Sequence, residues 1–270
     1  AINRDVQFSF RDNIEPVYRE LISLLLPAGN EKPSQENLEK SLYYAETIQL
    51  AELENFFGCS LQNLGIEKIN LNNSEEDTKE RLIKRVNDFV KNEPESALVF
   101  PIILQKNLAV IVKLPGKKEL LYYPNKIKDI TEVSNILNLA ENSLTKKGEG
   151  ELNDNQKNNL EKIYNWIIKP YTSLLKESRK DKESKKNKVK SLIFILDNSL
   201  RKIPIAGLYD GEKYLVDTDY VLAVAPSIQL LRPKRELHKI DLKTIIAESV
   251  VKRDKFDELD VKKGKPSEVI

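Results

Sequence analysis

The feature that most constrains the fold is a short apolar run, Ser191–Leu196, that leads directly into a polar turn. An uncharged run of this length is typical of a strand that is buried on both faces of a sheet. The run ends at Asp197, and the rigid corner of Pro204 follows. Asp at a strand end is either a functional group of an α/β sheet or a residue that shapes the turn. The turn-forming residues after Asp197 favour the structural role.

Two helical patterns separated by a short polar loop occupy residues 1–60. Apolar side chains recur at helical spacing from Ile14 to Leu25. Ser34 is a candidate N-cap for a second helix, whose apolar face extends to Phe56. Two helices joined in this way predict a helical hairpin, which we expect to lead in from an upstream repeat region.

Residues 61–178 predict an α+β part. A helix is expected over residues 73–94, because acidic residues fill its first turn, where the helix dipole favours them. Residues 96–124 are apolar and β-branched, with breaks at residues 105–107 and 115–116, and they predict a three-stranded antiparallel meander. Further helices are expected over residues 131–145 and 160–168, with a weak extension beyond.

The C-terminal part, residues 191–270, predicts more strands. Residues 214–231 indicate two short strands and a turn into a helix at Pro226–Ser227, and residues 242–249 indicate another strand. Strands separated by helices predict an α/β sheet. The run Arg179–Lys190 between the two parts holds seven basic and two acidic residues. It predicts a solvated basic loop, because a nucleic-acid site would interleave aromatic residues with the charges.

The overall charge and composition exclude several classes of protein. The chain has 44 basic and 42 acidic residues and a net charge of +2, so it has no general attraction for nucleic acid or for an anionic membrane. It has one Cys, which excludes an internal disulfide and favours a reducing compartment such as the cytoplasm. The sequence has no apolar run long enough to cross a membrane.

The usual chemical motifs do not occur in the sequence. There is no Gly-rich phosphate loop and no Gly-x-Ser-x-Gly elbow. With one Cys and one His, the chain cannot form a Cys/His metal cluster, and we expect neither a metal nor another cofactor. The single Cys/His pair is Cys59 with His238. Cys59 follows two Phe residues and is expected to be a core residue, whereas His238 lies in a charged connector.

Residues 192–231 resemble the N-terminal signature of the CHAT domain, a caspase-like domain found beside tetratricopeptide repeats, especially in cyanobacteria. Gly207 stands where the family usually has Ala. Residues 17–26, 34–57, 100–116 and 163–171 are also similar to the region that precedes the signature, and residues 59–93 match least well. The signature positions that match are Asp197, Leu200, Arg201, Pro204, Leu208, Tyr209, Asp210, Gly211, Tyr214, Leu215, Pro226, Ser227, Leu230 and Leu231.

The resemblance implies a caspase-type fold and cysteine endopeptidase chemistry. The expected fold class is α/β, a caspase-like sheet flanked by helices and preceded by the helical hairpin and the small antiparallel meander. In the family, the catalytic His and Cys follow strands of a C-terminal half, in Ala-Thr-His-Gly-like and Ser-Ala-Cys-like motifs that this chain lacks. We therefore expect the N-terminal, pseudo-caspase portion of a cyanobacterial-type member, with a sheet that is incomplete at its C-terminal end.

The expected partners are the C-terminal catalytic half and a protein substrate, with neither a membrane nor a nucleic acid. The alternative is a pseudo-protease that binds a partner and never cuts it. No catalytic role is assigned within the chain. We expect the signature residues to shape the sheet edge and the loop that abut the other half, or Asp197 to line a pocket that favours a basic residue. These candidate residues are Asp197, Leu200, Arg201, Pro204, Asp210, Gly211, Pro226 and Ser227.

Overall fold

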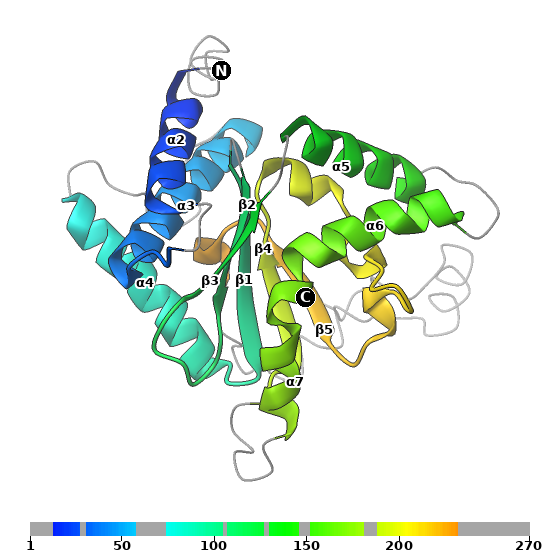
Figure 1. The fold of residues 1–270 in the computed structure, drawn as a ribbon. Coiled ribbons are helices and arrows are strands. Elements are labelled where there is room, and N and C mark those ends of the chain that lie inside the picture. The colour runs from blue at the N-terminus through cyan, green and yellow to red at the C-terminus, as the bar shows by residue number, and fades with distance from the viewer. Residues whose placement is uncertain are drawn as a thin grey trace, which may run out of the picture. The chain divides into compact units, whose positions relative to one another are not determined.

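The computed structural model describes residues 13–27, 31–57, 74–104, 107–126, 130–145, 152–180 and 188–231. These residues fall within one compact unit, Ala1–Leu231. They form a five-stranded sheet between two layers of helices, so the predicted α/β class is confirmed (Figure 1). The strand order is β3-β2-β1-β4-β5. The strands are β1 (Ser96–Ile103), β2 (Asn107–Lys113), β3 (Leu121–Lys126), β4 (Ser191–Ile195) and β5 (Val221–Ala225).

The predicted helical hairpin is confirmed and covers one face of the sheet together with the third helix (Figure 1). Ser34 caps the second helix as predicted, because its Oγ accepts a hydrogen bond from the Asn37 amide at 3.1 Å. Ser74 caps the third helix in the same way through the Asp77 amide. The helices of this layer are α2 (Glu15–Leu25), α3 (Gln35–Phe57) and α4 (Glu75–Asn92).

The other face of the sheet is covered by helices from the middle of the chain (Figure 1). Asn153 and Gln156 form a capping box that begins the second of these helices. That helix buries Leu160, Ile163 and Ile167 completely against the sheet. The elements of this layer are α5 (Ile130–Thr145), α6 (Asp154–Ile167), the 3₁₀ helix η3 (Lys169–Tyr171) and α7 (Thr172–Lys180).

The apolar strands are explained by this burial on both faces. Side chains along a strand alternate between the two faces of its sheet. In β4, Leu192 and Phe194 pack with α5 and α6, whereas Ile193 and Ile195 pack with α2, α3 and α4. A strand between two helical layers therefore needs apolar residues at every position, which is the pattern of the run that ends at Asp197.

The antiparallel meander and the signature strand form one continuous sheet. Strand β1 pairs antiparallel with β2 on one side and parallel with β4 on the other. Strand β4 in turn pairs parallel with β5. The sheet therefore joins the predicted α+β part to the signature-bearing part, and three parallel strands point their carboxyl ends at one edge.

One part of the strand prediction is wrong. Residues 214–231 contain one strand, β5, where two were expected. Tyr214 makes an isolated bridge to Tyr209, and the chain then turns into the 3₁₀ helix η6 (Leu215–Asp217), because Asp217 and Thr218 bond back to Tyr214 and Leu215. The helix expected after Pro226–Ser227 is a single 3₁₀ turn, η7 (Ile228–Leu230). Residues 59, 181–187, 238 and 242–249 lie outside the described residues.

Candidate functional site at the carboxyl edge of the parallel strands

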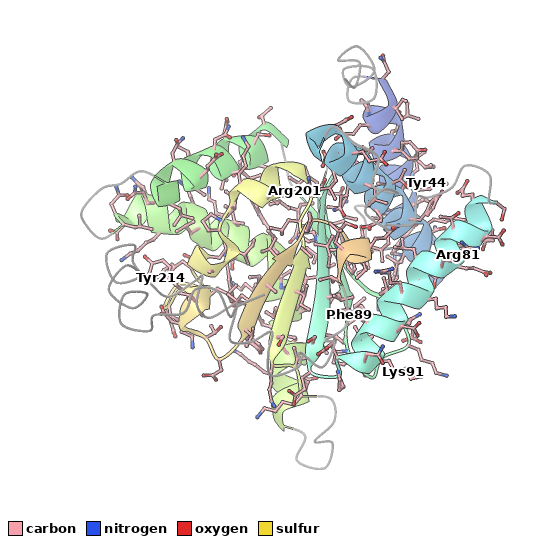
Figure 2. The ribbon with its side chains drawn as sticks, turned by 180° about the vertical axis from the view of Figure 1, so that it is seen from behind. Tyr44, Arg81, Phe89, Lys91, Arg201 and Tyr214 are labelled. Atoms are coloured by element: carbon pink, nitrogen blue, oxygen red, sulfur yellow. The ribbon has the colours of Figure 1, made fainter. Side chains whose placement is uncertain are left out.

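The carboxyl ends of β1, β4 and β5 lie at one edge of the sheet, where α/β proteins place functional groups. Asp197 lies just beyond the end of β4, after Leu196, and Ser227 lies just beyond the end of β5, after Pro226. Arg201 lies in the 3₁₀ helix η4 (Asn198–Lys202) that begins after Asp197. Figure 2 shows Arg201 where the sheet meets the layer of N-terminal helices. Three of the predicted site residues therefore face the same helical layer.

Asp197 is bound to Arg19 of α2 by a paired, charge-assisted interaction. The Asp197 side chain is buried, and its two oxygens accept hydrogen bonds from Nη1 and Nη2 of Arg19 at 2.8 and 2.9 Å. Asp197 Oδ2 also accepts from the Ile103 amide at 2.9 Å, and Arg19 Nη1 donates to the Ile103 carbonyl at 3.0 Å. This pair ties together α2 and the carboxyl ends of β1 and β4.

The charge of Arg19 is fixed by its surroundings. Burial alone lowers the pKa of the Arg19 guanidinium, but the hydrogen bonds and charges of Asp197 and then Glu15 outweigh it and raise that pKa. Glu15 lies one turn before Arg19 and accepts a hydrogen bond from its Nε at 2.7 Å. The cation is therefore shared between two carboxylates, and it occupies the position at Asp197 that a basic residue of another molecule would need.

Asp197 does not shape the following turn with its side chain, since the carboxylate does not cap η4. The turn is closed by the Leu200 amide, which donates to the Asp197 carbonyl at 2.9 Å. The Leu200 side chain is fully buried in the core beneath η4. The carboxylate is therefore free to join the strand ends to α2.

Arg201 makes a second connection to the hairpin. Its Nη1 lies 2.8 Å from Oε2 of Glu52 on α3, and its Nε donates to the Leu196 carbonyl at 2.9 Å. Burial raises the pKa of Glu52, and the charge of Arg201 acts in the opposite direction. The Nη2 of Arg201 is buried without a hydrogen-bond partner among the described residues.

Ser227 makes the third connection, to Glu46 of α3. Ser227 is 0 % exposed, and its hydroxyl donates to Oε1 of Glu46. The amides of Ile228 and Gln229, at the start of η7, donate to the same carboxylate at 3.3 and 3.2 Å. Burial raises the pKa of Glu46, and these hydrogen bonds act in the opposite direction. Ser227 is therefore a buried anchor for η7 and is closed to any substrate.

A small void lies beside this anchor, between α3, α4 and the sheet. Its volume is about 10 Å³, which is close to the space that a single water needs, and Glu46 and Gln49 are its polar lining residues. Arg85 of α4 holds η7 from the other side, donating to the Gln229 carbonyl at 2.7 Å. The carboxyl end of β5 is thus fixed to both α3 and α4.

Asp210 and Gly211 lie in a separate loop on the α5–α6 side. Asp210 closes a turn by accepting hydrogen bonds from the amides of Glu212 and Lys213 at 2.9 and 2.8 Å. Gly211 occupies this turn with φ +104°, a conformation that L side chains rarely adopt. Pro204 precedes the 3₁₀ helix η5 (Ile205–Gly207), and Pro226 precedes Ser227. The structure therefore divides the signature between two places.

The reasoning from sequence missed the three partners on the hairpin. Arg19, Glu46 and Glu52 are the side chains that bind Asp197, Ser227 and Arg201. A signal for Glu46 was present, because it lies four residues after the core residue Leu42 and thus on the buried side of its helix. A charged residue at a core position of an amphipathic helix predicts a buried partner.

The part of the chain that carries β4, β5 and the turns after them matches a known family. Residues 157–265 match the family model of the CHAT domain. Over this segment the chain is similar to the CHAT domain family. The match includes β4, β5 and all eight candidate residues, so the predicted family is confirmed for the part of the chain that carries the signature. No curated protein matches the chain.

The CHAT family is caspase-like, and the chain therefore carries a caspase-like module. The match begins inside α6, so the hairpin that binds the signature lies upstream of it. Across the described ranges, no helix has both the length and the apolar composition to span a bilayer. In the same ranges, no three His, Cys, Asp or Glu side chains are grouped as they would be to hold a metal ion. Three of the described signature residues, Asp197, Arg201 and Ser227, bind the CHAT segment to the hairpin.

Proposed function

We propose that this chain is the N-terminal, non-catalytic portion of a CHAT-family cysteine endopeptidase of the cyanobacterial type, which cleaves a partner protein in the cytoplasm. The catalytic His and Cys belong to a downstream segment or a separate chain. The observation that carries this proposal is a difference between two parts of the sheet edge. The polar groups of the signature are bound internally, whereas β5 has no second strand beside it among the described residues.

The open strand is apolar. Among the described residues, β5 pairs with β4 alone, and Val221 and Val224 are 64 % and 55 % exposed. These two side chains lie on opposite faces of the strand, as residues of different parity do. A strand edge with exposed valines on both faces favours pairing with another strand covered by its own helices. In the proposed function, the catalytic half supplies that strand.

The internal bonds of the signature fit this role. Arg19, Glu52 and Glu46 hold the strand ends and η7 against the hairpin. A rigid edge lowers the conformational entropy lost when a second segment docks on it. Asp197, Arg201 and Ser227 then act by positioning β4 and β5 and do not contact the substrate.

The experiment compares this chain with the full product of the gene that encodes it. Each protein is incubated with a panel of fluorogenic peptides and with a cysteine-reactive activity probe. We expect the full product to cleave and to be labelled at a cysteine other than Cys59, and the chain alone to do neither. Cleavage by the chain alone that is lost in Cys59→Ala would overturn the proposal.

The second candidate function is a pseudo-protease interaction module. The open strand β5 favours it equally, because the same edge can bind a partner without any chemistry. The encoding gene separates the two functions. Ala-Thr-His-Gly and Ser-Ala-Cys motifs downstream, together with probe labelling, support the peptidase, whereas partner binding without labelling supports the module.

A further inference from the structure

A second, separate site lies toward the other end of the parallel strands. A groove of about 490 Å³ runs between the C-terminal end of α4 and the turn that joins β2 to β3. Figure 2 shows Lys91 of this groove at the opposite end of the helical layer from Arg201. The groove is lined by Asn87, Val90, Lys91, Pro94, Lys113, Gly116, Lys117 and Lys118.

Four of these eight lining residues are lysines, and none is acidic. Lys91, Lys117 and Lys118 are exposed, whereas Lys113 is 2 % exposed and donates from Nζ to the Lys118 carbonyl at 2.6 Å. Burial lowers the pKa of Lys113, and the charges of Glu39 and Glu119 act in the opposite direction. Lys113 therefore fixes the turn, and Lys91, Lys117 and Lys118 supply the exposed positive charges of the groove.

The turn that carries Lys117 and Lys118 has a defined shape. Gly116 adopts φ +74°, and the Lys117 amide donates to the Leu114 carbonyl at 3.4 Å. A turn held in this way loses little backbone freedom when a ligand binds to its two lysines. The groove is thus a preorganised concave surface that carries three exposed lysines.

We infer that this groove binds a carboxylate-rich peptide segment of a partner protein. Its volume lies in the range of sites for ligands much larger than a single phosphate. Pro94 is exposed and supplies apolar surface beside the lysines, as a peptide with mixed side chains requires. No aromatic side chain lines the groove, so the bases of a single-stranded nucleic acid would have nothing to stack on.

The inference extends beyond the proposed function. It assigns partner recognition to α4 and the β2–β3 turn, at a distance from the signature and from β5. It therefore holds whether the chain belongs to an active peptidase or to a pseudo-protease. Opposite charges of this kind mainly raise the association rate and the specificity for acidic partners.

The test uses a fluorescein-labelled peptide rich in Glu and Asp and measures fluorescence anisotropy with the whole chain. The groove variant is Lys91→Glu/Lys117→Glu. The control is Lys169→Glu/Lys176→Glu, which makes the same change of net charge at two exposed lysines outside the groove. We expect the groove variant to bind the acidic peptide about tenfold more weakly than wild type, and the control variant to lose less than about twofold in affinity. The two should differ because exposed charges interact over about a Debye length, so lysines outside the groove contribute little.

A second groove variant, Lys117→Glu/Lys118→Glu, leaves α4 unchanged, so its loss of binding cannot come from a damaged helix. Thermal melts of all variants establish that they fold. Equal losses in groove and control variants would overturn the inference. So would equal binding of the matching Gln and Asn peptide, or a single-stranded oligonucleotide that binds as tightly and loses affinity in the same variants.

Discussion

The two ends of the parallel strands differ in how their charged side chains are paired. At the carboxyl edge, Asp197 and Arg201 are paired with charged residues of the hairpin inside the chain. In the groove that begins near the amino end of β1, Lys91, Lys117 and Lys118 surround an opening that no acidic residue lines. The first arrangement supports the architecture, and the second is suited to a partner.

The difference follows from burial. A charge that is removed from water is tolerated when it is paired and hydrogen-bonded, and removing one member of such a pair leaves the other uncompensated. An exposed lysine keeps its hydration, so its substitution changes stability little. The predictions below separate the two ends by this criterion, from the largest expected loss of stability to the smallest.

The largest effect is expected for Asp197→Ala. It leaves the partly buried Arg19 without its bidentate partner and the Ile103 amide without its acceptor. The free energy of unfolding should fall by about 3 kcal/mol, as measured by urea denaturation. The triple variant Glu15→Gln/Arg19→Leu/Asp197→Leu should recover part of this loss, because it also removes the charge of Glu15 and so leaves no uncompensated charge. A loss below about 1 kcal/mol for the single variant would show that the pair is dispensable.

The second predicted effect is that the stability of the fold depends on pH through Glu46. Its pKa in the folded chain is raised above the ordinary value of 4.5, so the folded state holds this proton more tightly than the unfolded state. Protonation of Glu46 contributes its full stability below pH 4.5, and this contribution is lost as the pH rises through the pKa of Glu46 in the folded chain. Glu46→Gln should flatten this slope, as measured by melting temperature against pH.

Glu52 also has a raised pKa, so some slope should persist in the Glu46→Gln variant. Glu54, a half-buried residue of the same helix, supplies a control, since Glu54→Gln changes the charge without entering the Ser227 anchor. The same slope in wild type and Glu46→Gln would contradict the prediction.

The third effect is expected at Arg201. Arg201→Met removes the ion pair with Glu52 and the hydrogen bond to the Leu196 carbonyl but keeps most of the side-chain volume. Because both partners are partly exposed, the loss should be about 1 kcal/mol in the free energy of unfolding. Lys202→Met, beside it on the exposed face of η4, serves as the control. A loss as large as that of Asp197→Ala would place the main connection at Arg201 instead.

The elements that could be predicted from sequence depend on local patterns. The hairpin, α4, the meander and β4 follow from apolar periodicity and from caps such as Ser34, which act over a few residues. The second strand expected within residues 214–231 failed for a related reason. The apolar run at Tyr214–Val216 is too short to outweigh the hydrogen bonds of Asp217 and Thr218 that close a turn there.

For the candidate site, the signature residues could be predicted from the sequence, but their partners on the hairpin could not. Asp197, Arg201 and Ser227 were identified by position and by resemblance, but their partners lie on the hairpin. Arg19 and Asp197 are 178 positions apart in the chain, and local patterns do not specify which distant residues pair. The groove was missed because its lysines come from α4 and from the β2–β3 turn, and each is ordinary for a solvated element.

The smallest effect on stability is expected in the groove. Lys117→Glu/Lys118→Glu reverses two exposed charges on a turn whose backbone is held by Gly116 and by the Lys113 contact to the Lys118 carbonyl. Neither substitution removes these backbone features, so the free energy of unfolding should change by less than about 0.5 kcal/mol. The same variant should lose the acidic peptide, whereas Asp197→Asn, if it stays folded, should bind it normally. A groove variant that unfolds as readily as Asp197→Ala would contradict the comparison between the two ends of the strands. The groove lysines would then be structural, as Asp197 is.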